Sequence, residues 1–553
     1  MNASRSPAPR RDDASGATLL EIRGLRIEGQ SEEAWHEIVK GIDLTLRRGE
    51  VLGLIGESGA GKSTIGLAAM GYARPGCRIT AGTIRFDGTD LAQASEADRR
   101  QLWGSRIAYV AQSAAASFNP AHRLIDQYAE AAVCHHVMSE GEAKKGAVEL
   151  FGRLRLPDPE HIGLRYPHQV SGGQLQRAMT AMAMACRPDL IIFDEPTTAL
   201  DVTTQIEVLA AIKDIVRQFN TAAIYITHDL AVVAQMADRV MVLRYGELVE
   251  EAPTGAMLAD PKRPYTKSLW AVRSLHKEEQ PGEELLLDVR DVDATYGKVL
   301  KVLHGISLEV PRGRTVAVVG ESGSGKSTLA RVITGLLPPS AGTIRFAGKA
   351  LPPRLAGRGK DLLRRVQMIY QMPDTALNPR RRVRDILGRP LRHHLGLRGR
   401  ACERRILELL RMIELDERFI DRLPSELSGG QKQRICIARA LAVNPELIIC
   451  DEVTSALDQI VAEGILKLLL RLQRELDVSF LYITHDLATV KAIADWIVVM
   501  HQGRIVQQGP KTQVLTPPHH PYTELLLSSV PEMRTDWLDQ LLRARAAKPE
   551  PRR

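Results

Sequence analysis

The segment Gly56–Thr64 reads GESGAGKST, and Gly320–Thr328 reads GESGSGKST. Both contain the pattern G-x-x-x-x-G-K-[ST], whose glycines let the backbone curl so that its N–H groups point at phosphate oxygens. An apolar run precedes each copy, VLGLI in the first and TVAVV in the second, which is the strand context that a phosphate loop requires. The sequence therefore predicts two phosphate-binding loops, each opening a helix whose N-terminus adds positive potential.

Two side chains in each loop carry the expected chemistry. The lysines Lys62 and Lys326 should reach the β- and γ-phosphates, and the serines Ser63 and Ser327 should hold Mg²⁺. A glycine-rich surface turn is the alternative for one isolated copy, and two copies in strand context argue against it. The predicted ATP-binding residues of the loops are Gly56, Glu57, Ser58, Gly59, Ala60, Gly61, Lys62, Ser63 and Thr64, and Gly320, Glu321, Ser322, Gly323, Ser324, Gly325, Lys326, Ser327 and Thr328.

Most of the sequence consists of two similar copies of one pattern. SGGQLQR at 171–177 recurs as SGGQKQR at 428–434, and YITHDLA at 225–231 recurs at 482–488. The offset between the copies is 257 residues in this region and 264 residues between the loop lysines. A near-constant offset of this size indicates a duplicated domain with loop-length changes, because solenoid repeats recur about every 20–50 residues.

An acidic pair closes an apolar run in each half, as IIF-Asp194-Glu195 and IIC-Asp451-Glu452. An aspartate at a strand end can hold the hydration shell of Mg²⁺, and the adjacent glutamate can orient or deprotonate the attacking water. A strand-ending acidic pair can also be purely structural. Its recurrence at a fixed distance after SGGQ favours the catalytic interpretation.

The SGGQ segments can expose backbone N–H groups at a helix start, where they would suit a γ-phosphate. With the phosphate loop, a Q-loop, SGGQ, the acidic strand, a D-loop and the YITH histidine in this order, each half resembles the nucleotide-binding domain of an ABC ATPase. The resemblance covers both halves and about nine-tenths of the chain. Domains of that family pair head to tail, which implies that each ATP contacts the phosphate loop of one half and the SGGQ of the other.

The resemblance also implies roles for individual residues. Gln112 and Gln371 match the Q-loop glutamine, which contacts Mg²⁺ and the attacking water, and Asp201 and Asp458 close the D-loops. The predicted catalytic residues are Glu195, Glu452, His228, His485, Gln112 and Gln371, and the predicted Mg²⁺ residues are Ser63, Gln112, Asp194, Ser327, Gln371 and Asp451. The SGGQ residues expected on ATP are Ser171, Gly172, Gly173 and Gln174, which complete the second loop's site, and Ser428, Gly429, Gly430 and Gln431, which complete the first.

One position differs between the halves. Tyr296 lies where the family stacks an aromatic ring on adenine, and alignment of the two halves places Gly29 at the matching position. We expect the first site either to hold adenine more weakly or to recruit Trp35. A stacked aromatic contributes about 0.5–1.5 kcal/mol, so the difference should affect affinity and not chemistry.

Fold class and domain boundaries follow from these patterns. Apolar runs ending in phosphate-type loops and alternating with helical stretches predict a parallel α/β sheet. The segments 111–170 and 370–427 have helical periodicity and predict an inserted helical subdomain. The resemblance implies two tandem P-loop NTPase domains, each a RecA-like α/β core with a β-rich N-terminal subdomain. We expect a disordered lead-in over 1–17, cassettes over 18–272 and 285–532, a linker over 273–284, and a basic tail over 533–553 that forms a short helix with a frayed end.

Composition narrows the class of protein. The length of 553 residues exceeds one hydrophobic core, and a charged fraction of 25% with 44% apolar residues excludes wholesale disorder. The net charge of +8 is compatible with polyphosphate, nucleic acid or anionic lipid and selects none of them. No run approaches the roughly 20 apolar residues of a membrane span, and the N-terminus lacks the apolar core of a signal peptide. The six cysteines form no CxxC pair, which favours a reducing cytosol.

Two further motifs indicate what the ATPase serves. An Asn-Pro pair follows each Q-loop, in SFNP (117–120) and ALNP (376–379), and a Pro-Tyr-Thr motif closes each half, in KRPYTKSL and HHPYTELL. Together they resemble ATPase subunits of the dipeptide, oligopeptide and nickel branch of bacterial importers. That resemblance implies a translocase-class ATPase at the cytoplasmic face of the inner membrane. Its partners would be two permease subunits and, indirectly, an extracytoplasmic solute-binding protein, with no nucleic acid.

Alternatives of other classes remain open at this point. A soluble twin-cassette ATPase acting on ribosomes also lacks membrane spans, but it usually has a long charged helical linker and no Pro-Tyr-Thr ending. A DNA-repair ATPase with SGGQ motifs would carry zinc cysteine pairs, which this chain lacks. The pair His519-His520 could be offered as a metal site, but adjacent histidines lack ligand spacing and a solvated loop is favoured.

Overall fold

The structure is a computed structural model that describes residues 16–31, 34–197, 200–271, 275–280, 282, 284–297, 299–455 and 457–547. The chain forms two compact units. Residues 1–200, 204–268 and 531–553 make the first unit, and residues 201–203 and 269–530 make the second. The expected lead-in falls almost wholly on residues 1–15, outside the described part of the chain.

The core of the first unit is a six-stranded sheet in the order β10-β9-β3-β8-β7-β6. Its strands β3, β7, β8 and β6 are parallel because every connection between them is a long crossover. All residues of the central strands are buried, as expected for a parallel sheet covered on both faces. The strands are β3 (Val51–Ile55), β6 (Ile107–Val110), β7 (Leu190–Asp194), β8 (Ala222–Ile226), β9 (Arg239–Arg244) and β10 (Glu247–Pro253).

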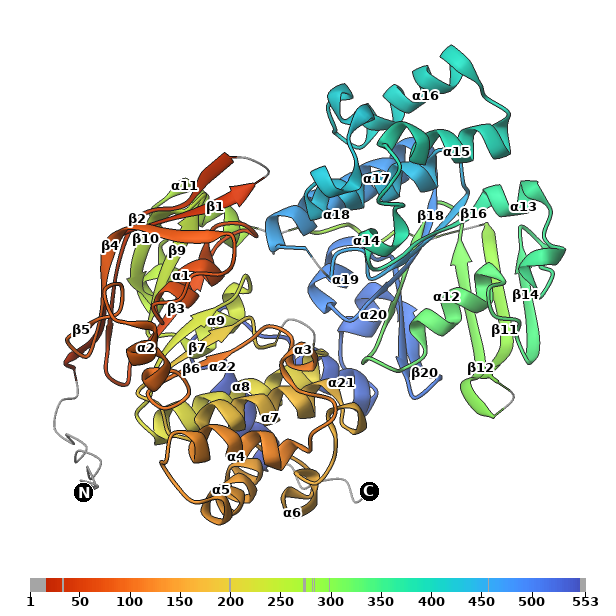
Figure 1. The fold of residues 1–553 in the computed structure, drawn as a ribbon. Helices are drawn as coiled ribbons and strands as arrows, with labels where there is room; N and C mark the ends of the chain where they lie inside the picture. The colour runs from red at the N-terminus through yellow and green to blue at the C-terminus, as the bar shows by residue number, and fades with distance from the viewer. Residues whose placement is uncertain are drawn as a thin grey trace, which may run out of the picture. The chain divides into compact units, whose positions relative to one another are not determined.

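A second, antiparallel sheet and a helical part complete this unit (Figure 1). The antiparallel sheet has the order β2-β1-β4-β5, with β1 (Thr18–Ser31), β2 (Ala34–Arg47), β4 (Cys77–Phe86) and β5 (Thr89–Asp90). Its inward side chains share one core with the parallel sheet, as Leu20 and Leu44 do with Leu52 and Ile192. The helical part lies between β6 and β7 and contains α3 (Ala114–Ser117), α4 (Leu124–Cys134), α5 (Glu140–Arg153), α6 (Pro159–Ile162) and the first turns of α7 (Gly172–Met184).

The second unit repeats this architecture, which confirms the predicted fold. Its six-stranded sheet runs β16-β17-β18-β13-β19-β20 and its antiparallel sheet runs β12-β11-β14-β15. The strands are β11 (Leu285–Tyr296), β12 (Leu300–Pro311), β13 (Thr315–Val319), β14 (Ala341–Phe346), β15 (Lys349–Ala350), β16 (Val366–Ile369), β17 (Leu447–Asp451), β18 (Ser479–Thr484), β19 (Trp496–His501) and β20 (Arg504–Pro510). The helical part contains α14 (Pro373–Ala376), α15 (Val383–Leu395), α16 (Gly399–Met412) and α17 (Gly429–Leu441).

The remaining helices connect or flank the sheets. In the first unit they are α1 (Lys62–Ala68), α2 (Glu96–Leu102), α8 (Val202–Gln218), α9 (Leu230–Met236), α10 (Thr254–Ala259) and α11 (Pro264–Ala271). In the second unit they are α12 (Lys326–Thr334), α13 (Lys360–Arg365), α18 (Gln459–Leu476), α19 (Leu487–Ile493), α20 (Lys511–Leu515) and α21 (Pro521–Ser528). None of the helices described is both long and apolar enough to cross a membrane.

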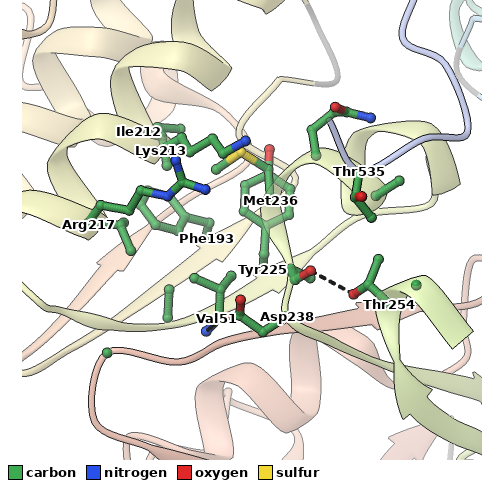
Figure 2. Close-up of a pocket in the computed structure, with 17 residues that line it drawn as sticks. Val51, Phe193, Ile212, Lys213, Arg217, Tyr225, Met236, Asp238, Thr254 and Thr535 are labelled. Carbon is green, nitrogen blue, oxygen red and sulfur yellow. Dashed lines mark hydrogen bonds between the residues drawn. The ribbon is translucent and has the colours of Figure 1, made fainter. Parts of the chain in front are cut away.

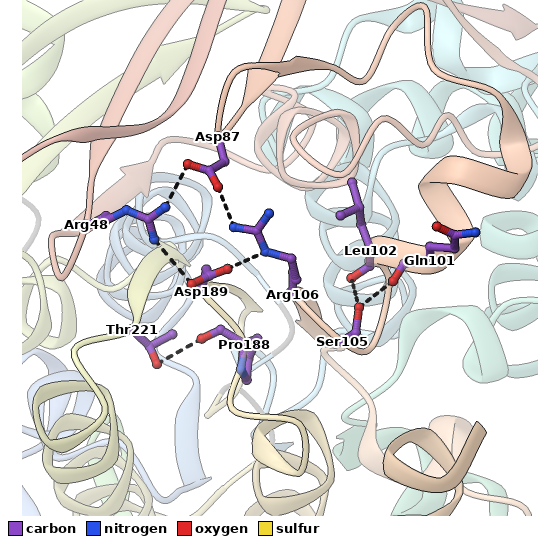
Figure 3. A network of polar contacts seen from close by, with 9 residues as sticks. All are labelled: Arg48, Asp87, Gln101, Leu102, Ser105, Arg106, Pro188, Asp189 and Thr221. Atoms are coloured by element: carbon purple, nitrogen blue, oxygen red, sulfur yellow. Dashed lines mark hydrogen bonds and ion pairs between the residues drawn. The ribbon is translucent and has the colours of Figure 1, made fainter. Parts of the chain in front are cut away.

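An ion-pair network joins the two sheets of the first unit (Figure 3). Arg48 and Arg106 each contact both Asp87, beside the antiparallel sheet, and Asp189, at the start of β7. The hydrogen bond from Arg106 lowers the pKa of Asp87. Shared charges of this kind fix the relative position of two sheets better than isolated surface pairs do. The network lies just before β3, β6 and β7, at the end of the parallel sheet opposite to the phosphate loop that follows β3.

The C-terminal tail packs on the first unit as helix α22 (Trp537–Ala547). Trp537 and Leu538 are buried, and the Gln235 amide donates to the carbonyls of Glu532 and Arg534 while its oxygen accepts from the Leu538 N–H. A cavity of about 510 Å³ remains under this segment, lined among others by Lys213, Asp238 and the tail's Thr535 (Figure 2). The expected short helix is present, and the end at 548–553 lies outside the described residues.

Linker residues contact the second unit around Asp495, the counterpart of Asp238, which lines the cavity under the tail in the first unit. The Lys277 ammonium lies against Gln473 and Asp495, where it donates 2.8 Å to the Gln473 side-chain oxygen. Glu279 accepts hydrogen bonds from the backbone and hydroxyl of Thr512. Polar residues of the linker are therefore tied to the second unit, as the tail is tied to the first.

Candidate functional site

Each phosphate loop joins a buried strand to a helix, β3 to α1 and β13 to α12. Glycine is required at the first loop position because φ is 150° at Gly56 and 156° at Gly320. A Cβ there would lie 2.2 Å from the backbone oxygen of Leu243 or Met500, respectively. Close backbone packing therefore fixes both loops in the curled form that exposes N–H groups.

The loop lysines fold back over their own loops. Lys62 donates to the carbonyls of Gly56 and Glu57, at 2.7 and 2.9 Å, and Lys326 makes the matching bonds to Gly320 and Glu321, at 2.8 and 2.7 Å. Both lysines are buried, and burial lowers the pKa of Lys326. An ammonium group held over a glycine-rich loop suits a polyphosphate.

The predicted Mg²⁺ residues converge in each unit. The Ser63 hydroxyl donates to Asp194 Oδ1 at 2.8 Å, and the Ser327 hydroxyl donates to Asp451 Oδ1 at 2.9 Å. Hydroxyl and carboxylate oxygens are the hard donors that Mg²⁺ prefers, so these residues fit the ion. Burial raises the pKa of Asp451.

The second acidic residue of each pair sits between two polar side chains. Glu195 accepts 3.0 Å from Gln112 Nε2 and lies 3.2 Å from His228 Nδ1. The glutamate has a left-handed backbone, with φ of 49°, a strained conformation that persists where the surroundings fix it. Although burial favours a neutral imidazole, the hydrogen bond to Glu195 raises the pKa of His228.

The second unit repeats this arrangement. Gln371 Nε2 donates 2.6 Å to Glu452, His485 Nδ1 lies 3.2 Å from it, and φ of Glu452 is 50°. Against the opposing effect of burial, the hydrogen bond from His485 lowers the pKa of Glu452. The same contact raises the pKa of His485 although burial opposes it. Each unit thus holds a carboxylate that can take a proton from water, beside an imidazole that can sense a phosphate.

The two SGGQ segments begin helices α7 and α17 as predicted. Ser171 caps its helix through the Gln174 N–H while Gln174 bonds back to the Ser171 N–H, and Ser428 and Gln431 do the same. A Cβ at Gly173 would lie 2.1 Å from Thr204, and a Cβ at Gly172 would meet open space. One glycine of the first segment is thus required by packing and the other leaves the helix start accessible. Which nucleotide these segments contact stays a prediction.

Both halves of the chain match one family model, described as ABC transporter, over residues 39–198 and 303–455. The chain belongs to the ABC transporter family. The matched ranges contain both phosphate loops and both acidic pairs, so this ABC protein is an ATP-binding and ATP-hydrolysing protein, as the sequence predicted. A second model, described as the C-terminal region of oligopeptide/dipeptide transporters, matches residues 506–553 and confirms the importer branch.

Curated relatives of this ABC protein match both cassettes. It is 38% identical to the glutathione import ATP-binding protein of Salmonella typhimurium, over 95% of this chain and 91% of the relative. It is 37% identical to the protein of the same name from Pectobacterium atrosepticum, over 93% and 89%. A solved ATP-binding cassette bound to ADP and Pi is 30% identical over 41% of this chain and 98% of its own, with a TM-score of 0.37.

The structure shows how the Pro-Tyr-Thr motifs serve the ABC sites, which sequence reasoning missed. The Tyr265 hydroxyl accepts a hydrogen bond from the Glu57 N–H at 3.3 Å, and the Tyr522 hydroxyl accepts one from the Glu321 N–H at 3.0 Å. Both tyrosines follow helix-starting prolines far from the loops in sequence. The repetition of the motif was the available signal, but nothing local indicated its partner.

The residues expected beside adenine differ between the units. The Tyr296 hydroxyl lies 3.4 Å from Thr328 and accepts from Arg331 at 3.2 Å, which places its ring beside the second phosphate-loop helix. Strand register confirms Gly29 as the counterpart, since Leu20 pairs with Phe86 as Leu287 pairs with Phe346. The Arg78 guanidinium lies over the ring of Trp35, 4.1 Å from the ring centroid.

The remaining candidates have structural contacts. His519 pairs with Glu524 at 2.7 Å, and His520 Nδ1 accepts from the Tyr522 N–H at the start of α21. No cluster of three metal-ligating side chains occurs among the residues described. The D-loop residue Asp458 caps α18 by accepting from the Val461 N–H. The six cysteines are free thiols, and four of them are buried.

Proposed function

We propose that this ABC ATPase powers import of a peptide-like solute of the glutathione class. The observation that carries the proposal is the match to glutathione import ATP-binding proteins over 95% of the chain. We propose peripheral association with the inner membrane, two permease subunits as direct partners and an extracytoplasmic binding protein as the source of solute. Ribosomal and DNA-repair functions have no comparable support.

The proposed chemistry is the same in each unit. Lys62 binds the β- and γ-phosphates, Ser63, Asp194 and Gln112 hold Mg²⁺, and Glu195 takes the proton of the attacking water. His228 hydrogen-bonds the γ-phosphate. Bound Mg²⁺ would neutralise the charge that develops on the phosphates. The equivalent assignments are Lys326, Ser327, Asp451, Gln371, Glu452 and His485 in the second unit.

We propose that each site is completed by the SGGQ of the other half, so that ATP favours the paired state and hydrolysis releases it. This is a difference in ligand affinity between two states. Two intact sets of catalytic residues support two hydrolytic sites. Both helix starts are capped in the same way, so either could present its N–H groups to a γ-phosphate.

The proposed permease-docking face follows the Q-loops, at 117–120 and 376–379. Phe118 and Leu377 of these segments are buried in the helical part, so their own contribution is to hold it together. Asn378 and Pro379 are exposed. Beside them in the second unit lies a cavity of about 710 Å³, whose lining includes the exposed apolar residues Leu336, Leu355 and Tyr370. An exposed apolar hollow with a polar rim suits an inserted helical loop of a permease.

Reconstitution tests the proposed function. The chain is assembled with its permeases and binding protein in lipid vesicles that contain Mg·ATP on the ATPase side. We expect labelled glutathione to accumulate, and unlabelled glutathione to compete better than an unrelated dipeptide. A charge reversal next to Asn378 should leave ATPase intact and reduce uptake. ATPase activity without uptake of any peptide-like solute would reject the proposed substrate class.

A further inference from the structure

The Mg²⁺-side aspartates of the two units have different surroundings. In the first unit, Asp194 accepts from Ser63 on Oδ1 and also from the Tyr109 hydroxyl on Oδ2, at 2.6 Å. The Arg74 guanidinium lies 4.0 Å from the same oxygen. Tyr109 and Arg74 are not among the residues that define the ABC motifs, and sequence reasoning did not single them out.

The second unit has no hydroxyl in the place of Tyr109, and the arginine whose charge acts on Asp451 is Arg331, which comes from α12. Met368 occupies the place of Tyr109, because Met368 pairs with Ile449 across β16 and β17 as Tyr109 pairs with Ile192 across β6 and β7. Pro338 occupies the place of Arg74 when the two loop helices are aligned. Within the described residues, Ser327 is the one side chain that hydrogen-bonds Asp451. The units therefore differ at the carboxylate while keeping every motif residue.

The position of Tyr109 suits a restraint on that carboxylate. Its strand lies beside β7, so its ring rises from the sheet next to the strand end that carries Asp194. The ring packs against the core of the unit, which limits its motion, and only the hydroxyl reaches the acid. A short O–H···O⁻ bond is among the stronger hydrogen bonds in proteins. With Ser63 on one oxygen and Tyr109 on the other, the plane of the Asp194 carboxylate is fixed.

We propose that Tyr109 is a positioning residue that preorganises Asp194 for the divalent cation, so that the first site binds the cation more tightly than the second. This inference rests on the proposed role of Asp194 at the cation site. Groups that orient a metal-binding carboxylate typically change affinity by about 10–100-fold when removed. We expect the lower end of this range for the loss of cation affinity, because Ser63 still hydrogen-bonds one oxygen of Asp194.

A titration with Mn²⁺ as the probe tests the proposal. The full chain carries Glu195→Gln and Glu452→Gln so that ATP persists, and bound Mn²⁺ is counted by electron paramagnetic resonance. Tyr109→Phe removes only the hydroxyl, and should weaken one of two Mn²⁺ sites about tenfold. Tyr109→Met, which copies the second unit, should do the same.

The reciprocal change gives a gain of function. Met368→Tyr places a hydroxyl near Asp451 and should tighten the weaker Mn²⁺ site, whereas the matched control Met368→Phe adds the ring alone and should not. A purely structural role for Tyr109 would not produce this gain. If a Tyr109 variant fails to fold, this pair decides the matter by itself.

Asp194→Asn separates the proposal from the function on which it rests. If Asp194 holds the cation, this variant weakens one Mn²⁺ site, and adding Tyr109→Phe to it produces no further loss. Unchanged Mn²⁺ binding in Tyr109→Phe, with weakened binding in Asp194→Asn, would overturn the role of Tyr109 alone. Unchanged binding in Asp194→Asn would overturn the cation site itself.

Discussion

The Tyr522 hydroxyl accepts a hydrogen bond from the backbone N–H of Glu321, 3.0 Å away, and so ties the C-terminal Pro-Tyr-Thr motif to the second phosphate loop. Its ring stacks on His501 at a centroid distance of 4.0 Å, which holds the hydroxyl in place. The first unit makes the equivalent bond between Tyr265 and Glu57. A motif used to recognise a transporter branch therefore also contacts the phosphate loop of each unit.

Removing this support should weaken nucleotide binding. Tyr522→Phe deletes one hydrogen bond worth about 0.5–1.5 kcal/mol, so we expect ATP affinity at one site to fall about 2- to 12-fold. Titration with a fluorescent ATP analogue measures it, and Tyr245→Phe, at an exposed tyrosine, is the matched control. Equal affinities for Tyr522→Phe and the control would show that the loop needs no such support.

Each glutamate that we propose as catalytic should be needed for turnover. Glu195→Gln and Glu452→Gln keep the side-chain shape but remove the proton acceptor, a change that costs about 10²–10⁴-fold at the site affected. We expect each single variant to lose much of the ATPase activity, measured as phosphate release, while ATP still binds. Wild-type activity in one variant beside abolished activity in the other would disprove the equivalence of the two sites.

Much of this arrangement could be predicted from the sequence, because the motifs depend on local geometry. The neighbouring residues already define the phosphate loop and the strand β7. The loop requires Gly56 and Lys62, and the end of the strand requires Asp194. Contacts made across the fold could not be predicted. Tyr109 meets Asp194 only because two strands lie side by side, and Tyr265 meets its loop across roughly two hundred residues of chain.

The tyrosine beside the second loop should matter for adenine. Tyr296→Ala removes a ring that lies against the start of α12, and we expect one ATP site to weaken by about 0.5–1.5 kcal/mol with kcat nearly unchanged. Trp35→Ala distinguishes the two expectations for the first site. A loss of affinity there would show that Trp35 exchanges its Arg78 contact for adenine, and no change would show a first site without an aromatic partner.

The pairing of His485 with Glu452 predicts a pH dependence of stability. The raised pKa of His485 contributes stability that is complete below about pH 6.5, its unfolded value, and is lost as pH rises through the folded pKa. The lowered pKa of Glu452 contributes stability above about pH 4.3 that is lost as pH falls through its folded value. The melting temperatures of wild type and His485→Gln should therefore differ most near pH 5–6.5 and converge at higher pH. A difference in melting temperature that does not change with pH would contradict the ion pair.

The tail should stabilise the first unit through a half-buried ion pair. Lys213 is 7% exposed and its ammonium lies 3.0 Å from Asp539 of α22, which is 38% exposed. Asp539→Ala leaves the Lys213 charge without this partner in a confined site. We therefore expect the free energy of unfolding to fall by more than the roughly 1 kcal/mol of an exposed pair, but by less than the roughly 3–5 kcal/mol of a buried pair. Chemical denaturation measures the loss. Adding Lys213→Met should restore part of it, since no buried charge remains, whereas purely additive losses would show that the two residues do not act as a pair.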